Sequence, residues 1–98
     1  MFTKKVKIKW QRDSYLNTGT ADREGPQATA LAELDAKTAE MVAEGKMSAD
    51  AIVEGSNLTV SSVRCVTDQA AAEEWVAFND TFAAKYGFVK LGAEIKPN

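Results

Sequence analysis

Residue types that could carry catalysis are few in this chain. Its 98 residues include no histidine and a single cysteine, Cys65. Histidine is the commonest general base and a common metal ligand, so its absence removes every Ser-His or Cys-His nucleophile pair. Cys65 falls in the middle of an alternating segment, where most cysteines are small core residues. The sequence therefore predicts no catalytic residues, no metal site and no cofactor.

The acidic residues come in pairs, the arrangement that general acid–base chemistry would use. Glu73 and Glu74 are adjacent, and Glu40 and Glu44 are one helical turn apart. Both pairs fall on polar faces of expected helices, so we interpret them as solvated surface. This favours a protein that is not an enzyme. The alternative is a cofactor-independent enzyme or binder of a small molecule.

Three lysines, Lys5, Lys7 and Lys9, occupy alternate positions of the first segment. The alternation over residues 2–11 predicts a strand with apolar residues on one face and this row of lysines on the other. Aromatic residues that stack RNA bases are absent from the lysine face, and the net charge is −2, so nucleic acid is not an expected partner. We expect the lysines to pair with acids of neighbouring strands, namely Asp50, Glu54 or Glu94.

Two further groups of residues are candidates for binding. Residues 12–25 form an expected loop of unusual length, and such loops are often functional. We interpret it either as a binding loop or as a plain surface loop. The second group would lie between the sheet and the helices, where a small molecule could bind. The candidates are Tyr15, Asn17 and Arg23 in the loop, and Trp10, Trp75 and Asn79 in the second group.

Two helices position these residues. The first is expected from Pro26 to Glu44, and the second begins after Thr67 as its N-cap and ends at Gly87. The apolar face of the second helix is the strongest core signal in the chain. The first helix also carries a stripe of small residues, which would face the second helix or a partner chain: Ala28, Ala32, Ala36, Ala39 and Ala43.

Three more alternating segments predict strands, at 47–54, 58–66 and 89–95. A short helix over 48–53 is the alternative for the first of them. In the middle segment the apolar residues change face at Ser61-Ser62. Either a bulge switches the inward set there, or both faces are partly covered, as an oligomer would require.

The resulting order, β-α-β-β-α-β, resembles that of ferredoxin-like domains. It predicts one α+β domain over residues 1–98, with a four-stranded antiparallel sheet and two helices on one face. The stretch from Gly45 to Val66, followed by Asp68 and residues 70–75, resembles the second half of dimeric α+β barrel proteins. That resemblance implies a homodimer with facing open sheets and, in some members, cofactor-free oxygenation of aromatic substrates.

The sequence also leads to expectations for the location and the function of the protein. No stretch reaches the roughly 20 apolar residues of a membrane span, and no apolar signal segment follows Met1. A lone cysteine fits the cytoplasm. The chain also resembles small accessory proteins common in phage genomes. We therefore expect an accessory domain that forms a homodimer and binds a protein partner, through its open sheet face or the 12–25 loop.

Overall fold

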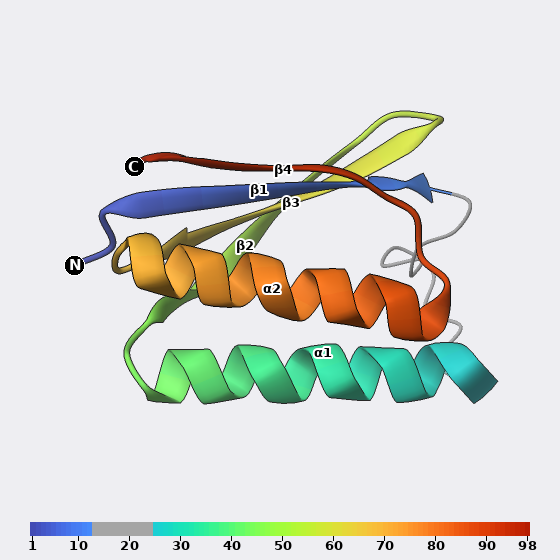
Figure 1. Cartoon of the computed structure of the whole chain (residues 1–98), viewed down its shortest axis with the longest axis horizontal. Helices are drawn as coiled ribbons and strands as arrows, with labels where there is room; N and C mark the ends of the chain where they lie inside the picture. The colour runs from blue at the N-terminus through green and yellow to red at the C-terminus, as the bar shows by residue number, and fades with distance from the viewer. Residues whose placement is uncertain (13–24) are drawn as a thin grey trace.

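The structure of the protein, a computed structural model, describes residues 1–12 and 25–98. Its elements follow the predicted order (Figure 1). Among the predicted site residues, Tyr15, Asn17 and Arg23 lie outside the described residues. The elements are β1 (Lys4–Gln11), α1 (Gly25–Ala43), β2 (Met47–Gly55), β3 (Thr59–Val66), α2 (Gln69–Tyr86) and β4 (Lys90–Pro97).

The four strands form one antiparallel sheet in the order β2-β3-β1-β4. β1 is central and pairs with β3 on one side and β4 on the other. Both helices lie on the same side of the sheet (Figure 1). This confirms the ferredoxin-like α+β fold, and none of the described helices or strands covers the other side of the sheet.

The core lies between the sheet and the helices. Val6, Ile8 and Trp10 of β1 are fully buried there, as the alternation of the first segment predicts. On α2, Phe82 is buried and packs against Phe88, with their ring centroids 5.3 Å apart. The helix-facing side of the sheet and the apolar face of α2 therefore form one aromatic-rich core.

The ends of α2 follow from two residues. Asp68 is the N-cap, because its carboxylate accepts a hydrogen bond from the backbone N–H of Ala71 at 2.8 Å. The prediction that Thr67 caps this helix is therefore wrong by one residue. Gly87 ends the helix at φ 73°, in the left-handed conformation that glycine adopts without a steric cost.

β2 is a strand, so the alternative of a short helix over 48–53 is wrong. Its pairing with β3 shifts between Met47 and Ala51. Arg64 of β3 stabilises this irregular stretch, because its guanidinium donates hydrogen bonds to the carbonyls of Ala49 at 3.1 Å and Ser48 at 3.5 Å. The peptide groups that leave the regular ladder thereby keep a hydrogen-bond donor.

The predicted bulge at Ser61-Ser62 is wrong, because β3 pairs with β1 in unbroken register from Thr59 to Val66. Apolar residues of β3 are instead buried on both faces of the sheet: Val60 and Val66 beneath the helices, and Val63 on the other side. The alanine stripe of α1 is largely exposed and is not covered by α2. Its exposed members are Ala32, Ala36, Ala39 and Ala43.

Candidate functional site

The side of the sheet opposite the helices, here called the open face, is defined by strand pairing. Lys5, Lys7 and Lys9 of β1 lie directly across from Cys65, Val63 and Ser61 of β3. Residues opposite each other in an antiparallel pair point to the same face. Extending the register to both edge strands adds Ile52 and Glu54 of β2, and Gly92, Glu94 and Lys96 of β4.

The charges of the open face are only partly neutralised. Lys7 forms an ion pair with Glu54 at 3.5 Å, reaching across β3, which confirms one of the predicted pairings. Lys96 and Glu94 pair at 2.9 Å on β4. Among the described residues, neither Lys5 nor Lys9 forms an ion pair.

Glu94 lies in the positive electrostatic field of the lysines on this face. Its pKa is lowered, first by the hydrogen bond and charge of Lys96 and then by the charges of Lys7 and Lys9. Neighbouring cations favour the ionised carboxylate. Lys7 lies directly opposite Glu94 in the β1–β4 register, so the lysine row of β1 and the carboxylate of β4 form one charged surface.

Among the described residues, three depressions lie on the open face. Those on either side of Lys7 and Lys9 have volumes of about 350 Å³, against Gly92 and Glu94, and about 230 Å³, against Glu54 and Ser61. The third, about 220 Å³, lies at the centre of the face over Val63 and Ile52. These hollows are open to solvent, which suits contact with another surface.

The apolar part of the open face is small and central. Val63 is 7% exposed although neither α1 nor α2 lies over it, because its cross-strand neighbours Lys7 and Ile52 stand on either side. Ile52 itself is 57% exposed.

The charges of the chain divide between its two layers. The four strands carry seven Lys or Arg and three Asp or Glu, a net charge of +4. The two helices carry two Lys and six Asp or Glu, a net charge of −4. The overall charge of −2 therefore hides a positive sheet layer and a negative helix layer.

Trp10, Trp75 and Asn79 lie on the opposite side of the sheet from the lysines. Trp10 and Trp75 are buried in the core, and Trp75 stacks on Phe78 with ring centroids 5.7 Å apart. Asn79 is buried and donates a hydrogen bond from Nδ2 to the carbonyl of Trp75 at 2.8 Å, one turn earlier in its own helix. The predicted site residues within the described chain thus form two groups, separated by the sheet.

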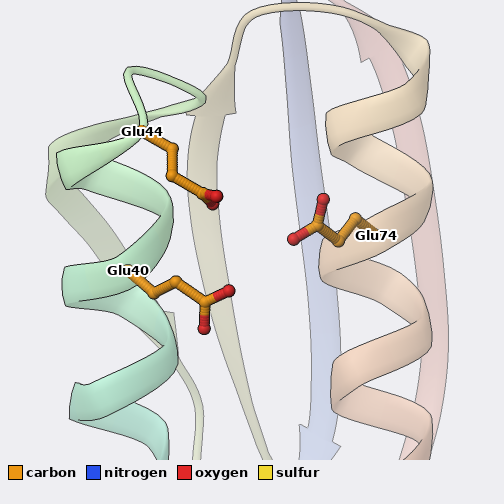
Figure 2. Close-up of side chains that lie close together, drawn as sticks. All are labelled: Glu40, Glu44 and Glu74. Carbon is orange, nitrogen blue, oxygen red and sulfur yellow. The ribbon is translucent and has the colours of Figure 1, made fainter.

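A second charged cluster joins the two helices, and sequence reasoning predicted only part of it. Glu40 and Glu44, at the C-terminal end of α1, and Glu74 of α2 turn toward one another, with carboxylate oxygens within 4.8 Å (Figure 2). The spacing of Glu40 and Glu44 is visible in the sequence. The arrival of Glu74 beside them depends on how the helices pack.

Two lysines neutralise this cluster. Glu74 accepts hydrogen bonds from Lys37 and from Lys46, each at 3.0 Å. Lys37 also lies 3.6 Å from Glu40, and Lys46 lies 3.6 Å from Glu44. The hydrogen bond from Lys37, followed by that from Lys46, lowers the pKa of Glu74 and keeps it ionised. The arrangement is an ion-pair network that ties α1 to α2.

Comparison with protein-family models, with curated proteins and with solved structures gives no match for this chain. Neither helix of the described part is long and apolar enough to cross a membrane. Because a ferredoxin-like fold hosts many unrelated activities, function is inferred from the site itself.

Proposed function

We propose that this chain is a small accessory domain without enzymatic activity, which binds a protein surface through the open face of its sheet. One observation carries the proposal. Within residues 1–12 and 25–98, no helix or strand covers this side of the sheet, where Lys5 and Lys9 lack a described ion pair and Ile52 is exposed. Protein interfaces combine a small apolar centre with a polar rim in this way.

The shape of the open face supports a macromolecular partner over a small molecule. The depressions among the described residues measure about 220–350 Å³ and are partly open to solvent, whereas small-molecule sites enclose most of the ligand. The lysine row supplies charges that steer association and select a partner of complementary charge. Membership of the dimeric α+β barrel superfamily stays a prediction, as does a binding role for residues 12–25.

The proposal places the domain in the cytoplasm. Cys65 is a free cysteine on the open face, across from Lys5. A partly exposed thiol suits a reducing compartment, where it stays unmodified.

The proposal is tested by photo-crosslinking in the native host. A benzophenone amino acid replaces Lys9 on the open face, and the matched control replaces Ala36, which is exposed on the outer surface of α1. We expect covalent protein adducts from position 9 in clear excess over position 36, whether with a second copy or with another chain. Equal yields at both positions, or no adduct at position 9, would contradict the proposal.

A further inference from the structure

We propose that the free edge of β2 binds an extended segment of another protein, which adds a strand to the sheet beside residues 51–55 and carries a lysine or arginine next to Glu54. This edge is distinct from the open face, so binding there goes beyond the proposed function. Three properties of β2 carry the inference: the direction of its backbone groups, the exposure of its side chains and its charge.

The hydrogen bonds between β2 and β3 fix which backbone groups of β2 point outward. β2 lies at an edge of the sheet and, within the described part of the chain, pairs with β3 alone. In the turn that joins them, the Ser56 N–H donates a hydrogen bond to the Thr59 carbonyl at 2.9 Å. Hydrogen-bonded and non-hydrogen-bonded pairs alternate along an antiparallel ladder, so Glu54 and Ile52 also direct their backbone groups toward β3. The alternate residues direct theirs outward: Ala51, Val53 and Gly55.

These outward groups make β2 a suitable edge for another strand. Among residues 1–12 and 25–98, no backbone hydrogen bond reaches them from outside the β2–β3 ladder. Residues 49–55 are all exposed. A row of free N–H and C=O groups is a template for strand addition, which is a common mode of peptide recognition. The stretch in regular register with β3, residues 51–55, has the length of an ordinary strand.

The two edges of the sheet differ in how they resist strand addition. β4, at the other edge, begins with Lys90 and ends with Lys96 and Pro97. Lysine on an edge strand opposes pairing, and proline lacks the N–H that a new strand would need. β2 contains neither lysine nor proline. The contrast assigns the binding edge to β2.

Two branched side chains lie on this edge, one on each face of the sheet. Ile52 is 57% exposed on the open face, and Val53 is 54% exposed on the opposite face. Val53 shares its face with the helices, but the turn end of the β2–β3 hairpin projects beyond them (Figure 1). A neighbouring strand brings side chains against both residues and covers their apolar surface. The residue opposite Val53 is therefore expected to be apolar.

The charge of β2 selects the partner. The strand contains two acidic residues and no basic one, so two copies of β2 side by side would repel each other. The side chain of Glu54 is 58% exposed, and Lys7 lies 3.5 Å from its carboxylate on the inner side of the strand. The outer side remains open to a second cation. Because alternate residues of a strand share a face, the partner strand alternates basic and apolar residues.

The test uses a peptide of this pattern, Thr-Lys-Val-Lys-Val-Lys-Thr, capped at both ends. In antiparallel addition, its valines lie opposite the outward residues of β2 and exchange hydrogen bonds with them, whereas the N–H groups of its lysines face solvent. We expect a dissociation constant below about 1 mM. N-Methylation of the valines removes the donors and should weaken binding at least about tenfold. N-Methylation of the same number of lysines should leave binding unchanged.

Amide hydrogen exchange locates the peptide on the chain. We expect bound peptide to slow exchange at the outward amides of Ala51, Val53 and Gly55. Val53→Pro removes one of these donors without touching the ladder to β3, and it should abolish binding. The matched control, Val53→Thr, keeps the donor and the branched shape and should bind as wild type. Circular dichroism verifies folding, and if Val53→Pro is unfolded, the N-methylated peptides decide the question on the wild-type chain.

The charge requirement is tested separately. A peptide with glutamate in place of lysine should bind at least about tenfold more weakly than the lysine peptide. Glu54→Gln should weaken binding of the lysine peptide by about two- to fivefold. Equal binding of the two peptides would overturn the basic character of the partner.

Three further results would overturn the inference. The first is no binding at about 1 mM peptide. The second is equal weakening by both N-methylated peptides, or slowed exchange away from residues 51–55. The third is slowed exchange at these amides in the chain alone together with a particle of twice its mass, because a second copy would then occupy the edge. Photo-crosslinking at position 9 reports on the open face and is independent of each of these results.

Discussion

The two faces of β1 show how one strand contributes to stability and to recognition. On the side of the helices, Val6, Ile8 and Trp10 are fully buried. On the open face, the intervening lysines are flanked by shallow depressions. Burial of apolar area dominates folding free energy, whereas exposed ion pairs contribute little. The covered face therefore determines stability, and the open face is free to carry binding groups.

The strongest test of this comparison removes a large core side chain. Phe82→Ala deletes a ring that is 1% exposed and packs against Phe88, so we expect the free energy of unfolding to fall by about 3–5 kcal/mol. The control, Ile52→Ala on the open face, should cost less than about 1 kcal/mol because its side chain is already half in solvent. Urea denaturation of dilute protein measures both. Equal losses would show that the two faces do not differ in this way.

An intermediate effect is expected at the centre of the open face. Val63→Ala removes two methyl groups from a side chain that is 7% exposed, which should cost about 1.5 kcal/mol. The loss is smaller than at Phe82 because flexible neighbours such as Lys7 can close over the gap. Urea denaturation under the same conditions gives the value. A loss as large as that of Phe82→Ala would mean that the open face also belongs to the core.

The smallest effect concerns the ion pairs between the helices. Hydrogen bonds from Lys37 and Lys46 lower the pKa of Glu74 below its unfolded value. The stabilisation is therefore present above the unfolded pKa, about 4.3, and is lost as the pH falls through the lower folded value. Since Glu74 is about one-third exposed, we expect Glu74→Gln to cost no more than about 1 kcal/mol at neutral pH.

The pH dependence provides the control for this prediction. Below the folded pKa of Glu74 the variant and the wild-type chain should be equally stable, because the carboxyl is then protonated in both folded and unfolded wild-type protein. Asp35→Asn, an exposed change on the same helix layer, should leave stability unchanged at either pH. A difference for Glu74→Gln that persists in acid would assign its effect to packing and not to charge.

Much of the fold could be predicted because each helix or strand has its own hydrophobic periodicity in the sequence. The alternation of apolar and polar residues predicted β1 and its buried side chains. Gly87 predicted the end of the second helix, because glycine adopts the left-handed conformation found there without a steric cost. The errors were local as well. Asp68 and not Thr67 caps α2, because both side chains are good caps and only the backbone path selects one. The bulge predicted at Ser61-Ser62 was also wrong, because β3 is a regular strand that buries apolar residues on both faces of the sheet.

The candidate site was only partly visible in the sequence. The lysine row of β1 and its pairing with Glu54 follow from alternation and strand order. The joining of Glu74 to Glu40 and Glu44 did not follow, since residues on different helices meet only when the helices pack. The positions of Trp75 and Asn79 between the sheet and the helices were predicted from the apolar face of the second helix, and both residues are buried.

The sequence by itself determined the order of elements, the two-sided character of β1 and the absence of histidine chemistry, because these depend on residue type and on spacing along one segment. Only the tertiary structure decided that β3 buries apolar residues on both faces of the sheet and that the three glutamates meet. The physical reason is that strand order and helix packing depend on contacts between distant segments. The hydrophobic periodicity of one segment does not specify which distant segment it contacts.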